Sequence, residues 1–264
     1  MDTYTFRAGT APLLVSMPHT GTHLPPELGA RMTRAARVLP DTDWHLERLY
    51  DFLDALGASV LVATHSRYVV DLNRPPDDTN LYPGQDTTGL VPVDTFARAP
   101  VYQDGAAPDG AEIAARIDRY WRPYHARLGQ ELERLRSAHG YALLWDAHSI
   151  ASRVPRFFSG RLPDLNLGTA GGRSCARAAI DAVAAVAQRA AGYTAVLDGR
   201  FKGGYITRRY GQPNTRVHTI QLELAEITYM EEAPPFAFDE ARAARLRPVL
   251  RALLEAMLAA GRSL

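Results

Sequence analysis

The chain has 264 residues, of which 46% are hydrophobic and 22% charged, and its formal net charge is +1. Such a composition is typical of a globular protein with a sizeable core, so we expect one domain spanning residues 1–264. The near-neutral charge without a basic run argues against a nucleic-acid partner. Because there is no apolar run of about 18 residues and no secretory pattern, we expect a cytoplasmic protein without a membrane partner.

The single cysteine, Cys175, limits the chemistry that the chain can use. It excludes an internal disulfide, and a metal site would have to draw its ligands from His, Asp or Glu. The sequence makes no prediction of oligomeric state.

The first candidate site residues follow a short apolar run. Residues 13–17 predict a strand, and the Pro-His-Thr-Gly-Thr-His segment at 18–23 predicts a turn at its carboxyl end. His19 and His23 lie in this turn. We interpret His23 as an ordinary loop residue, whereas His19 is a candidate because ligands collect at the carboxyl ends of strands in α/β proteins.

Two aspartates come next. Asp41 and Asp43 precede leucines and a tyrosine spaced three or four residues apart between 46 and 56, which indicates an amphipathic helix. We expect one aspartate to be the N-cap of that helix. The other is then free to bind a ligand.

A second apolar run, residues 59–64, predicts another strand. The segment that follows, 66–76, is interpreted as a further strand that carries Asp71 and ends in Asn73 and Arg74 against two prolines. An arginine on such a stiff exit can bind a carboxylate with both prongs of its guanidinium group.

Residues 77–108 predict a long loop rich in Pro, Gly, Asp and Thr, of a length that is usually functional or disordered. Apolar positions spaced three or four apart then predict a long helix over 113–135, which Pro123 should kink or start. We expect Tyr120 and Trp121 to pack in the core, and His125 to face solvent or lie at a helix end.

The stretch 142–149, Ala-Leu-Leu-Trp-Asp-Ala-His-Ser, predicts a buried strand that ends in polar groups. Asp146 and His148 are two residues apart, so both point to one side of the strand. A Pro- and Gly-rich segment, 151–172, follows and should border any site at this strand end.

The last third of the chain predicts a helix around 176–186, a strand at 194–198, a glycine-rich basic loop at 199–211 and a core-covering helix over 246–258. The loop lacks the Gly-Lys-Ser/Thr ending of a phosphate-binding loop. In the strand predicted at 219–225, Ile220, Leu222 and Leu224 face one way and Gln221 and Glu223 the other. A carboxylate buried on such a strand needs a partner or a function.

Together these residues suggest a metal-dependent hydrolase. Catalytic zinc takes three protein ligands and leaves one position for water. His19, Asp43 and His148 can supply three ligands, and Glu223 can then take a proton from the activated water. The Asn-Arg pair would hold a substrate carboxylate. The metal can be zinc, but also iron, cobalt or manganese.

Five motifs, taken in order, resemble the N-formylglutamate deformylase family, also called N-formylglutamate amidohydrolases. They are Ser-Met-Pro-His-Thr-Gly at 16–21, Asp-Thr-Asp-Trp at 41–44, Ser-Arg-Tyr-Val-Val-Asp-Leu-Asn-Arg at 66–74, Trp-Asp-Ala-His-Ser at 145–149 and Phe-Lys-Gly-Gly-Tyr-Ile-Thr at 201–207. The resemblance covers nearly the whole chain. It implies hydrolysis of N-formyl-L-glutamate, a small-molecule substrate, to L-glutamate and formate, the last step of one bacterial route of histidine breakdown.

The family in turn resembles the zinc carboxypeptidases. This implies a single α/β domain (phosphorylase/hydrolase-like) with a mixed, mostly parallel sheet, helices on both faces and the site at the strand carboxyl ends. It also implies that substrate-binding residues come from the third and fifth motifs: Arg67, Asn73, Arg74 and Tyr205.

The chain departs from the carboxypeptidase pattern at the second metal ligand. Those enzymes have a glutamate three residues after the first histidine, and this chain has Thr22 there. Asp43 is our choice for that ligand, with Asp41 and His23 as alternatives. Two other functions stay open: hydrolysis of another N-acyl acidic amino acid, and metal-free binding of acidic amino acids.

Overall fold

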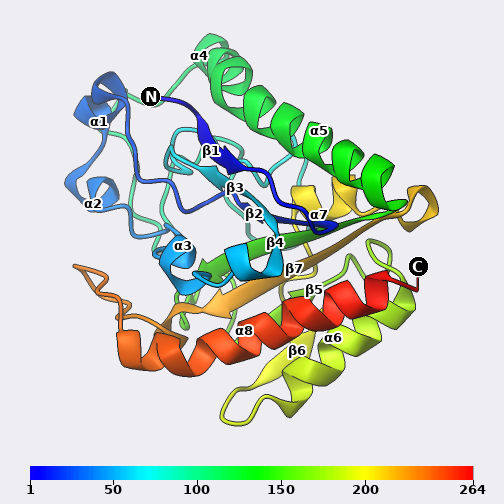
Figure 1. Ribbon diagram of the computed structural model, residues 1–264. Helices are drawn as coiled ribbons and strands as arrows, with labels where there is room; N and C mark the ends of the chain where they lie inside the picture. Colours follow the sequence, from blue (N-terminus) through cyan, green and yellow to red (C-terminus); the bar gives the residue numbers. More distant parts are fainter. Residues whose placement is uncertain (264) are drawn as a thin grey trace.

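The computed structural model describes residues 1–263, which build one seven-stranded sheet with helices on both faces (Figure 1). The strands are β1 (Tyr4–Arg7), β2 (Leu13–Met17), β3 (Ser59–Ala63), β4 (Ala142–Ile150), β5 (Leu165–Gly168), β6 (Ala195–Leu197) and β7 (Val217–Ala225). Their order across the sheet is β1-β3-β2-β4-β7-β5-β6. Only the β1–β3 and β7–β5 pairs are antiparallel in this described sheet, which confirms the predicted mixed, mostly parallel α/β architecture.

The helices form two layers. They are α1 (Pro26–Arg31), α2 (Arg34–Arg37), α3 (Leu46–Leu49), α4 (Gly110–Arg116), α5 (Arg122–His139), α6 (Arg177–Arg189), α7 (Tyr205–Tyr210) and α8 (Glu240–Gly261). In Figure 1, α4 and α5 cover one face of the sheet, and α6 and α8 cover the other. Within residues 1–263, no helix combines the length and the apolar character that a membrane crossing requires.

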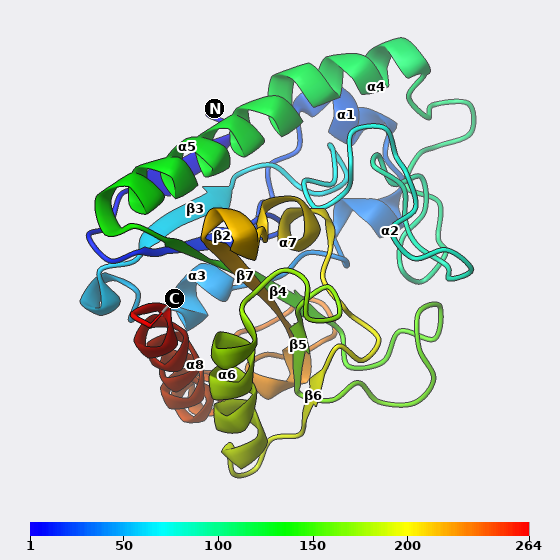
Figure 2. The same cartoon turned by 90° about the vertical axis from the view of Figure 1, so that its right-hand side faces the viewer.

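The long helix predicted over 113–135 is observed, with a π-helical stretch, η2 (Ile117–Trp121), between α4 and α5. Pro123 lies in the first turn of α5, where a missing backbone N–H is tolerated. Short 3₁₀ turns, η1 (Asp54–Leu56), η3 (Pro213–Thr215) and η4 (Glu226–Thr228), complete the connections. Figure 2 shows the two long loops predicted from composition extending on the same side of the molecule.

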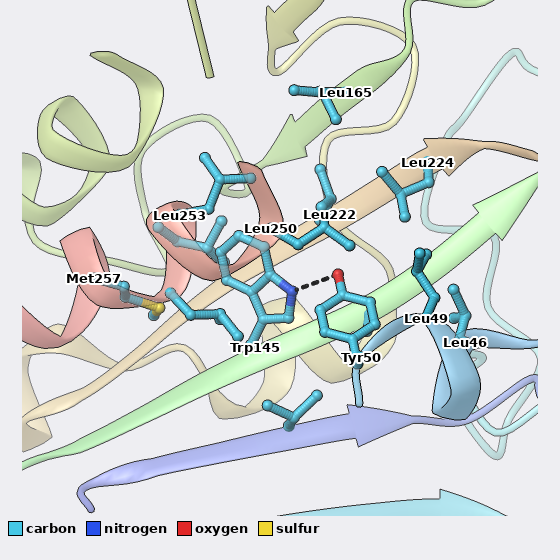
Figure 3. Close-up of a cluster of buried hydrophobic side chains, with 14 of the residues drawn as sticks. Leu46, Leu49, Tyr50, Trp145, Leu165, Leu222, Leu224, Leu250, Leu253 and Met257 are labelled. Carbon is cyan, nitrogen blue, oxygen red and sulfur yellow. Dashed lines mark hydrogen bonds between the residues drawn. The ribbon is translucent and has the colours of Figure 1, made fainter. Parts of the chain in front are cut away.

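The core between the sheet and helices α6 and α8 is built around Trp145 on β4. Its indole is fully buried against leucines of β7 and α8, and its Nε1 donates to the hydroxyl of Tyr50 at 3.1 Å (Figure 3). Alternate residues of β2, β4 and β7 supply this face, because side chains on a strand point to opposite sides in turn. Truncation of such a side chain costs about 3–5 kcal/mol of stability.

The opposite face of the same strands changes from apolar to polar along their length. Leu14 and Leu144 pack under α5, but towards the carboxyl ends Ser16, Asp146 and Gln221 occupy this face. Residue pairing continues the pattern, since His148 on β4 lies directly opposite Glu223 on β7. The sheet therefore brings its polar residues together at one end, as the alternation in 219–225 predicted.

Two sequence predictions about local structure were wrong. Residues 66–76 form turns rather than a strand, because Ser66 and Asp71 accept hydrogen bonds from backbone N–H groups two residues further on. The helix predicted after Asp43 is reduced to α3 and irregular turns. Neither aspartate caps it, since its N-cap position is His45 and no side chain caps it there.

Candidate active site

Three buried side chains, His19, Asp43 and His148, meet at the carboxyl ends of β2 and β4. His148 Nδ1 lies 3.0 Å from Asp43 Oδ2, and His19 Nδ1 lies 3.8 Å from the same oxygen. One possible ligand atom from each residue falls within 4.8 Å of the others, and residues 1–263 hold one such group. Two imidazoles and a carboxylate at this spacing are a donor set that suits a divalent transition metal.

The fold explains how residues so distant in sequence come together. β2 and β4 are adjacent and parallel, so the turn after β2 and the end of β4 lie at the same edge. The backbone N–H of Asp43 donates to the carbonyl of His19 at 3.1 Å, which fixes the aspartate over that edge. Asp43 was our choice among three candidates, and Asp41 and His23 lie outside this group.

Asp41 has a different role. Its Oδ2 accepts hydrogen bonds from the Tyr68 hydroxyl at 2.7 Å and from the Phe96 backbone N–H at 2.9 Å. His23 pairs through its backbone with His65, and the two rings meet edge to face. Asp41 thus ties the loop around Phe96 to the site.

The far nitrogen of each histidine also has an acidic neighbour. His19 Nε2 lies 2.7 Å from Asp71 Oδ1, and His148 Nε2 lies 3.2 Å from Asp146 Oδ1. Metal-binding histidines usually donate their second N–H to a carboxylate, which leaves the first nitrogen free for the metal. Asp146 Oδ1 is buried and lacks a hydrogen bond within the described chain, so it can accept the Nε2–H that metal binding at Nδ1 requires, whereas the Asn73 amide can donate to Nε2 only in the other tautomer. The residues present therefore fit a metal ion.

Buried charges at the site shift the pKa values of its members. Burial opposes protonation of His148, but Asp146 and Asp43 outweigh it and hold the pKa of His148 well above its usual value. Burial lowers the pKa of His19, and the cation of Arg67 lowers it further. A proton on His148 balances the surrounding carboxylates, and a metal cation would compete with that proton for the same place.

Glu223 lies in the same cavity as the histidines. It is 8% exposed, stands opposite His148 on the neighbouring strand, and lines the cavity with Gln221. Burial raises the pKa of the Glu223 carboxyl above its usual range and outweighs the opposite influence of His148. A carboxyl group with a raised pKa beside a metal-binding group has the properties of a general base.

Arg67 lines the cavity but is held by acids. Its Nη2 donates to Asp71 Oδ2 at 2.6 Å, and its Nη1 lies 4.0 Å from Asp43 Oδ1. Arg67 therefore links the acid behind His19 to the proposed metal-binding aspartate. These two pairings engage Nη1 and Nη2. The Nε has no acceptor within the described chain, so it is the atom left for the expected contact with substrate.

Asn73 and Arg74 also line the cavity, and their contact with substrate stays a prediction. Asn73 Nδ2 lies 2.9 Å from His148 Nε2, and its Oδ1 accepts the backbone N–H of Ile206 at 2.8 Å. A side chain at position 204 would collide with Asn73, because a Cβ there would lie 2.4 Å from its amide nitrogen. Gly204 is thus needed for this close approach. Arg74 is only 16% exposed, and its nearest carboxylate oxygen, on Asp71, is 4.0 Å away.

Tyr205 follows Gly204, which lines the cavity, but is not itself among the lining residues, so its contact with substrate stays a prediction. It begins α7, and its ring packs against Trp121 and His125. His125 was misinterpreted, since it is buried rather than solvent-facing. The spacing of apolar residues predicts one buried face of the helix. His125 lies on that face beside Tyr124, but a histidine does not contribute to the apolar pattern.

These aromatic residues hold the backbone that carries Asn73 and Arg74. Trp121 Nε1 donates to the carbonyl of Arg74 at 3.0 Å, and the Tyr205 N–H donates to the carbonyl of Asn73 at 3.2 Å. His125 Nε2 lies 2.9 Å from the carbonyl oxygen of Leu72. We call these three contacts the backbone clamp. The π-helical stretch that ends at Trp121 is a feature often found beside functional sites.

Sequence reasoning missed the supporting roles of Asp71 and Asp146 and the presence of Arg200 in the cavity. Asp71 lies in the segment predicted as a strand and Asp146 lies two residues before His148, but the sequence pattern assigns neither aspartate a role. Arg200 stands in the basic segment 199–211 with Lys202, Arg208 and Arg209, so nothing in the sequence distinguished it.

Comparison with known proteins identifies the family of this chain. The family model for N-formylglutamate amidohydrolase matches residues 11–230. The N-formylglutamate deformylase of Pseudomonas aeruginosa is 54% identical over 99% of this chain and 98% of that protein. The Pseudomonas putida N-formylglutamate deformylase is 52% identical over 97% and 96%. The crystal structure of N-formylglutamate amidohydrolase from Ralstonia eutropha JMP134 matches with a TM-score of 0.85 and 27% identity, covering 100% of both chains. The chain belongs to the N-formylglutamate amidohydrolase family.

Proposed function

We propose that this protein hydrolyses the formyl amide of N-formyl-L-glutamate to L-glutamate and formate, with a divalent metal ion held by His19, Asp43 and His148. The observation that carries the proposal is that the two histidines of this buried group line one cavity together with Glu223 and several arginines. The names of the two Pseudomonas relatives support the substrate. The same resemblance supports a place at the end of histidine breakdown, and the cytoplasmic location stays a prediction.

The metal would be zinc, since two histidines and a carboxylate are a common ligand set for catalytic zinc, although iron, cobalt and manganese share these preferences. When bound, such an ion supplies Lewis-acid polarisation of the formyl carbonyl and lowers the pKa of water. Asp71 and Asp146 orient the two histidines from behind. Arg67 restrains Asp43 and Asp71 together.

Glu223 would act as the general base. It accepts a proton from the attacking water and returns it to the amine nitrogen as the carbon–nitrogen bond breaks, which yields formate and the free amino acid. Its position opposite His148 in the sheet supports this role, because the carboxyl group is fixed beside the metal-binding residues. Arg74 and Asn73 would bind the α-carboxylate, since Arg74 adjoins Asp71, which in turn contacts His19.

The test is an assay of formate release from N-formyl-L-glutamate before chelation, after chelation, and after adding back zinc, iron, cobalt or manganese. We expect activity that chelation abolishes and one metal ion restores, with one bound ion per chain. Faster hydrolysis of N-acetyl-L-glutamate would favour the alternative acyl group. Binding of glutamate derivatives without turnover or metal would favour the binding-protein alternative, and either result would overturn the proposal.

A further inference from the structure

Arg200 lies in the loop after β6 and lines the same cavity as Arg74. We propose that Arg200 binds the side-chain carboxylate of the substrate and so makes the enzyme selective for N-acylated acidic amino acids. This inference rests on the proposed function, because it assigns a specificity determinant to the same cavity. Arg200 would be the second anion-binding residue of the site, after Arg74, for a proposed substrate that carries two carboxylates.

The hydrogen bonds of Arg200 do not pair its charge with a carboxylate group. Its Nε donates to the carbonyl of Phe157 at 2.7 Å, and its Nη2 donates to the carbonyl of Asp86 at 3.3 Å. Neither acceptor is a carboxylate, and the described chain places no acid within 4.0 Å of this guanidinium group, although other arginines are paired in this way. The Asp86 carboxylate itself is occupied by Arg98 and Arg156.

The lack of a direct ion pair matters because the guanidinium group of Arg200 is partly shielded from solvent. Arg200 is half-buried, and its guanidinium carbon lies 5.5 Å from the ring centre of Tyr82, 5.7 Å from Phe157 and 5.3 Å from Phe201. Burial lowers the pKa of Arg200 and outweighs the opposite influence of Tyr82, Glu223 and Asp86, as burial outweighs Asp71 for Arg74. A partly desolvated cation that is held in place by two carbonyl groups is prepared to bind an anion.

The positions of the two arginines indicate which carboxylate each one binds. Arg74 adjoins the metal-binding group through Asp71 and His19. Arg200 is hydrogen-bonded to the loops at Asp86 and Phe157, and the Glu223 carboxylate acts on its charge from beyond ion-pair distance. In an N-formylglutamate molecule the α-carboxylate is one carbon from the amide nitrogen, and the other carboxylate lies at the end of the side chain. The inner cation therefore fits the α-carboxylate, and Arg200 fits the distal one.

The experiment measures kcat/KM of the metal-loaded protein for N-formyl-L-glutamate and for N-formyl-L-glutamine, which has a neutral side-chain amide. In Arg200→Gln we expect a fall of about 10- to 1000-fold for formylglutamate, the range expected when a charged hydrogen-bonded contact is lost. For formylglutamine we expect a change of about threefold or less. The preference for the acid over the amide should therefore collapse.

Arg208→Gln is the matched control. Arg208 also lies over the Tyr82 ring, at 4.9 Å, and its Nε donates to a backbone carbonyl, but it is not among the residues that line the cavity. Its variant should keep the wild-type preference. If Arg200→Gln does not fold, Arg200→Lys takes its place, because it keeps the charge but loses the fork and should show a smaller fall for formylglutamate alone.

Equal losses for both substrates would overturn the inference and make Arg200 a loop support. Unchanged constants would overturn it as well, because the side chain would then not touch the substrate. A wild-type protein that hydrolyses neither compound when loaded with metal would instead contradict the proposed function, so the two failures are distinguishable.

Discussion

His19 Nε2 and Asp71 Oδ1 lie 2.7 Å apart, with both side chains buried. Burial acts to raise the pKa of Asp71, but His19 and Arg67 outweigh it and hold that pKa well below its usual value. Asp71 is therefore ionised and accepts the Nε2–H of His19, so the Nδ1 lone pair is directed towards Asp43. The pair fixes the orientation and the tautomer of a proposed metal ligand.

Asp71→Asn should accordingly weaken metal binding by about 10- to 100-fold, the usual effect of losing such a supporting contact. The measurement is competition with a chromogenic chelator, with His148→Ala, which removes a ligand outright, as the reference for complete loss. Asp77→Asn is the control, because Asp77 is exposed and only accepts a hydrogen bond from its own turn. Equal affinity in Asp71→Asn and wild type would remove Asp71 from the site.

Arg74→Lys keeps the charge but cannot make a two-pronged contact with a carboxylate. We expect kcat/KM for N-formyl-L-glutamate to fall by about 10- to 1000-fold. The variant should also discriminate less between this substrate and its α-amide. Arg122→Lys, at an exposed position on α5, controls for the substitution itself. Unchanged discrimination would move the α-carboxylate to another cation, with Arg67 the next candidate.

Glu223→Gln tests the mechanism. The variant keeps the shape of the side chain but cannot accept a proton, so kcat should fall by about 100-fold or more, with folding and substrate binding intact. Metal content distinguishes the two possible roles of this residue: a full complement of metal supports a base, whereas lost metal with rescue by excess ion would make Glu223 a ligand. Glu231→Gln, an exposed position, should behave as wild type.

His125 makes a prediction about stability. Burial lowers its pKa to about 3 in the folded protein, from an ordinary value near 6.5. Between these values the unfolded chain binds a proton that the folded protein does not, so stability is complete above pH 6.5 and is lost as the pH falls towards 3. From pH 7 to pH 5 this one group should lower the free energy of unfolding by about 2 kcal/mol.

Urea unfolding of the metal-free protein at the two pH values measures this loss. His125→Gln should lose less stability over the interval than wild type, whatever its stability at pH 7. His139→Gln should follow the wild type, because His139 is exposed at the end of α5. Parallel losses in wild type and His125→Gln would contradict a neutral, buried His125.

The strands that carry the chemistry could be predicted because their sequence pattern is local. Uninterrupted apolar residues before Asp146 predicted β4, and alternation around Glu223 predicted β7 and the side to which the glutamate points. Spatial neighbours of the ligands could not be predicted in this way. Asp71 lies in turns that its own side chain helps to form, and the β-branched residues before it resembled a strand.

Long-range contacts explain the remaining errors. His125 is buried because Leu72, more than fifty residues earlier, offers a carbonyl group to its ring. Arg200 belongs to the cavity because two loops from other parts of the chain, at Asp86 and Phe157, hold it there. No pattern within one segment reports such contacts.

The opposition of His148 and Glu223 on β4 and β7 has a consequence for how relatives of this chain can diverge. Both residues share the strand register with the buried Trp145 and Leu222, so an insertion or deletion of one residue in either strand would invert the proposed catalytic positions and the core positions together. The loop that carries Arg200 is free of this constraint. Substrate preference can therefore change by loop replacement during evolution, while the hydrolytic apparatus is inherited as a unit with the hydrophobic core.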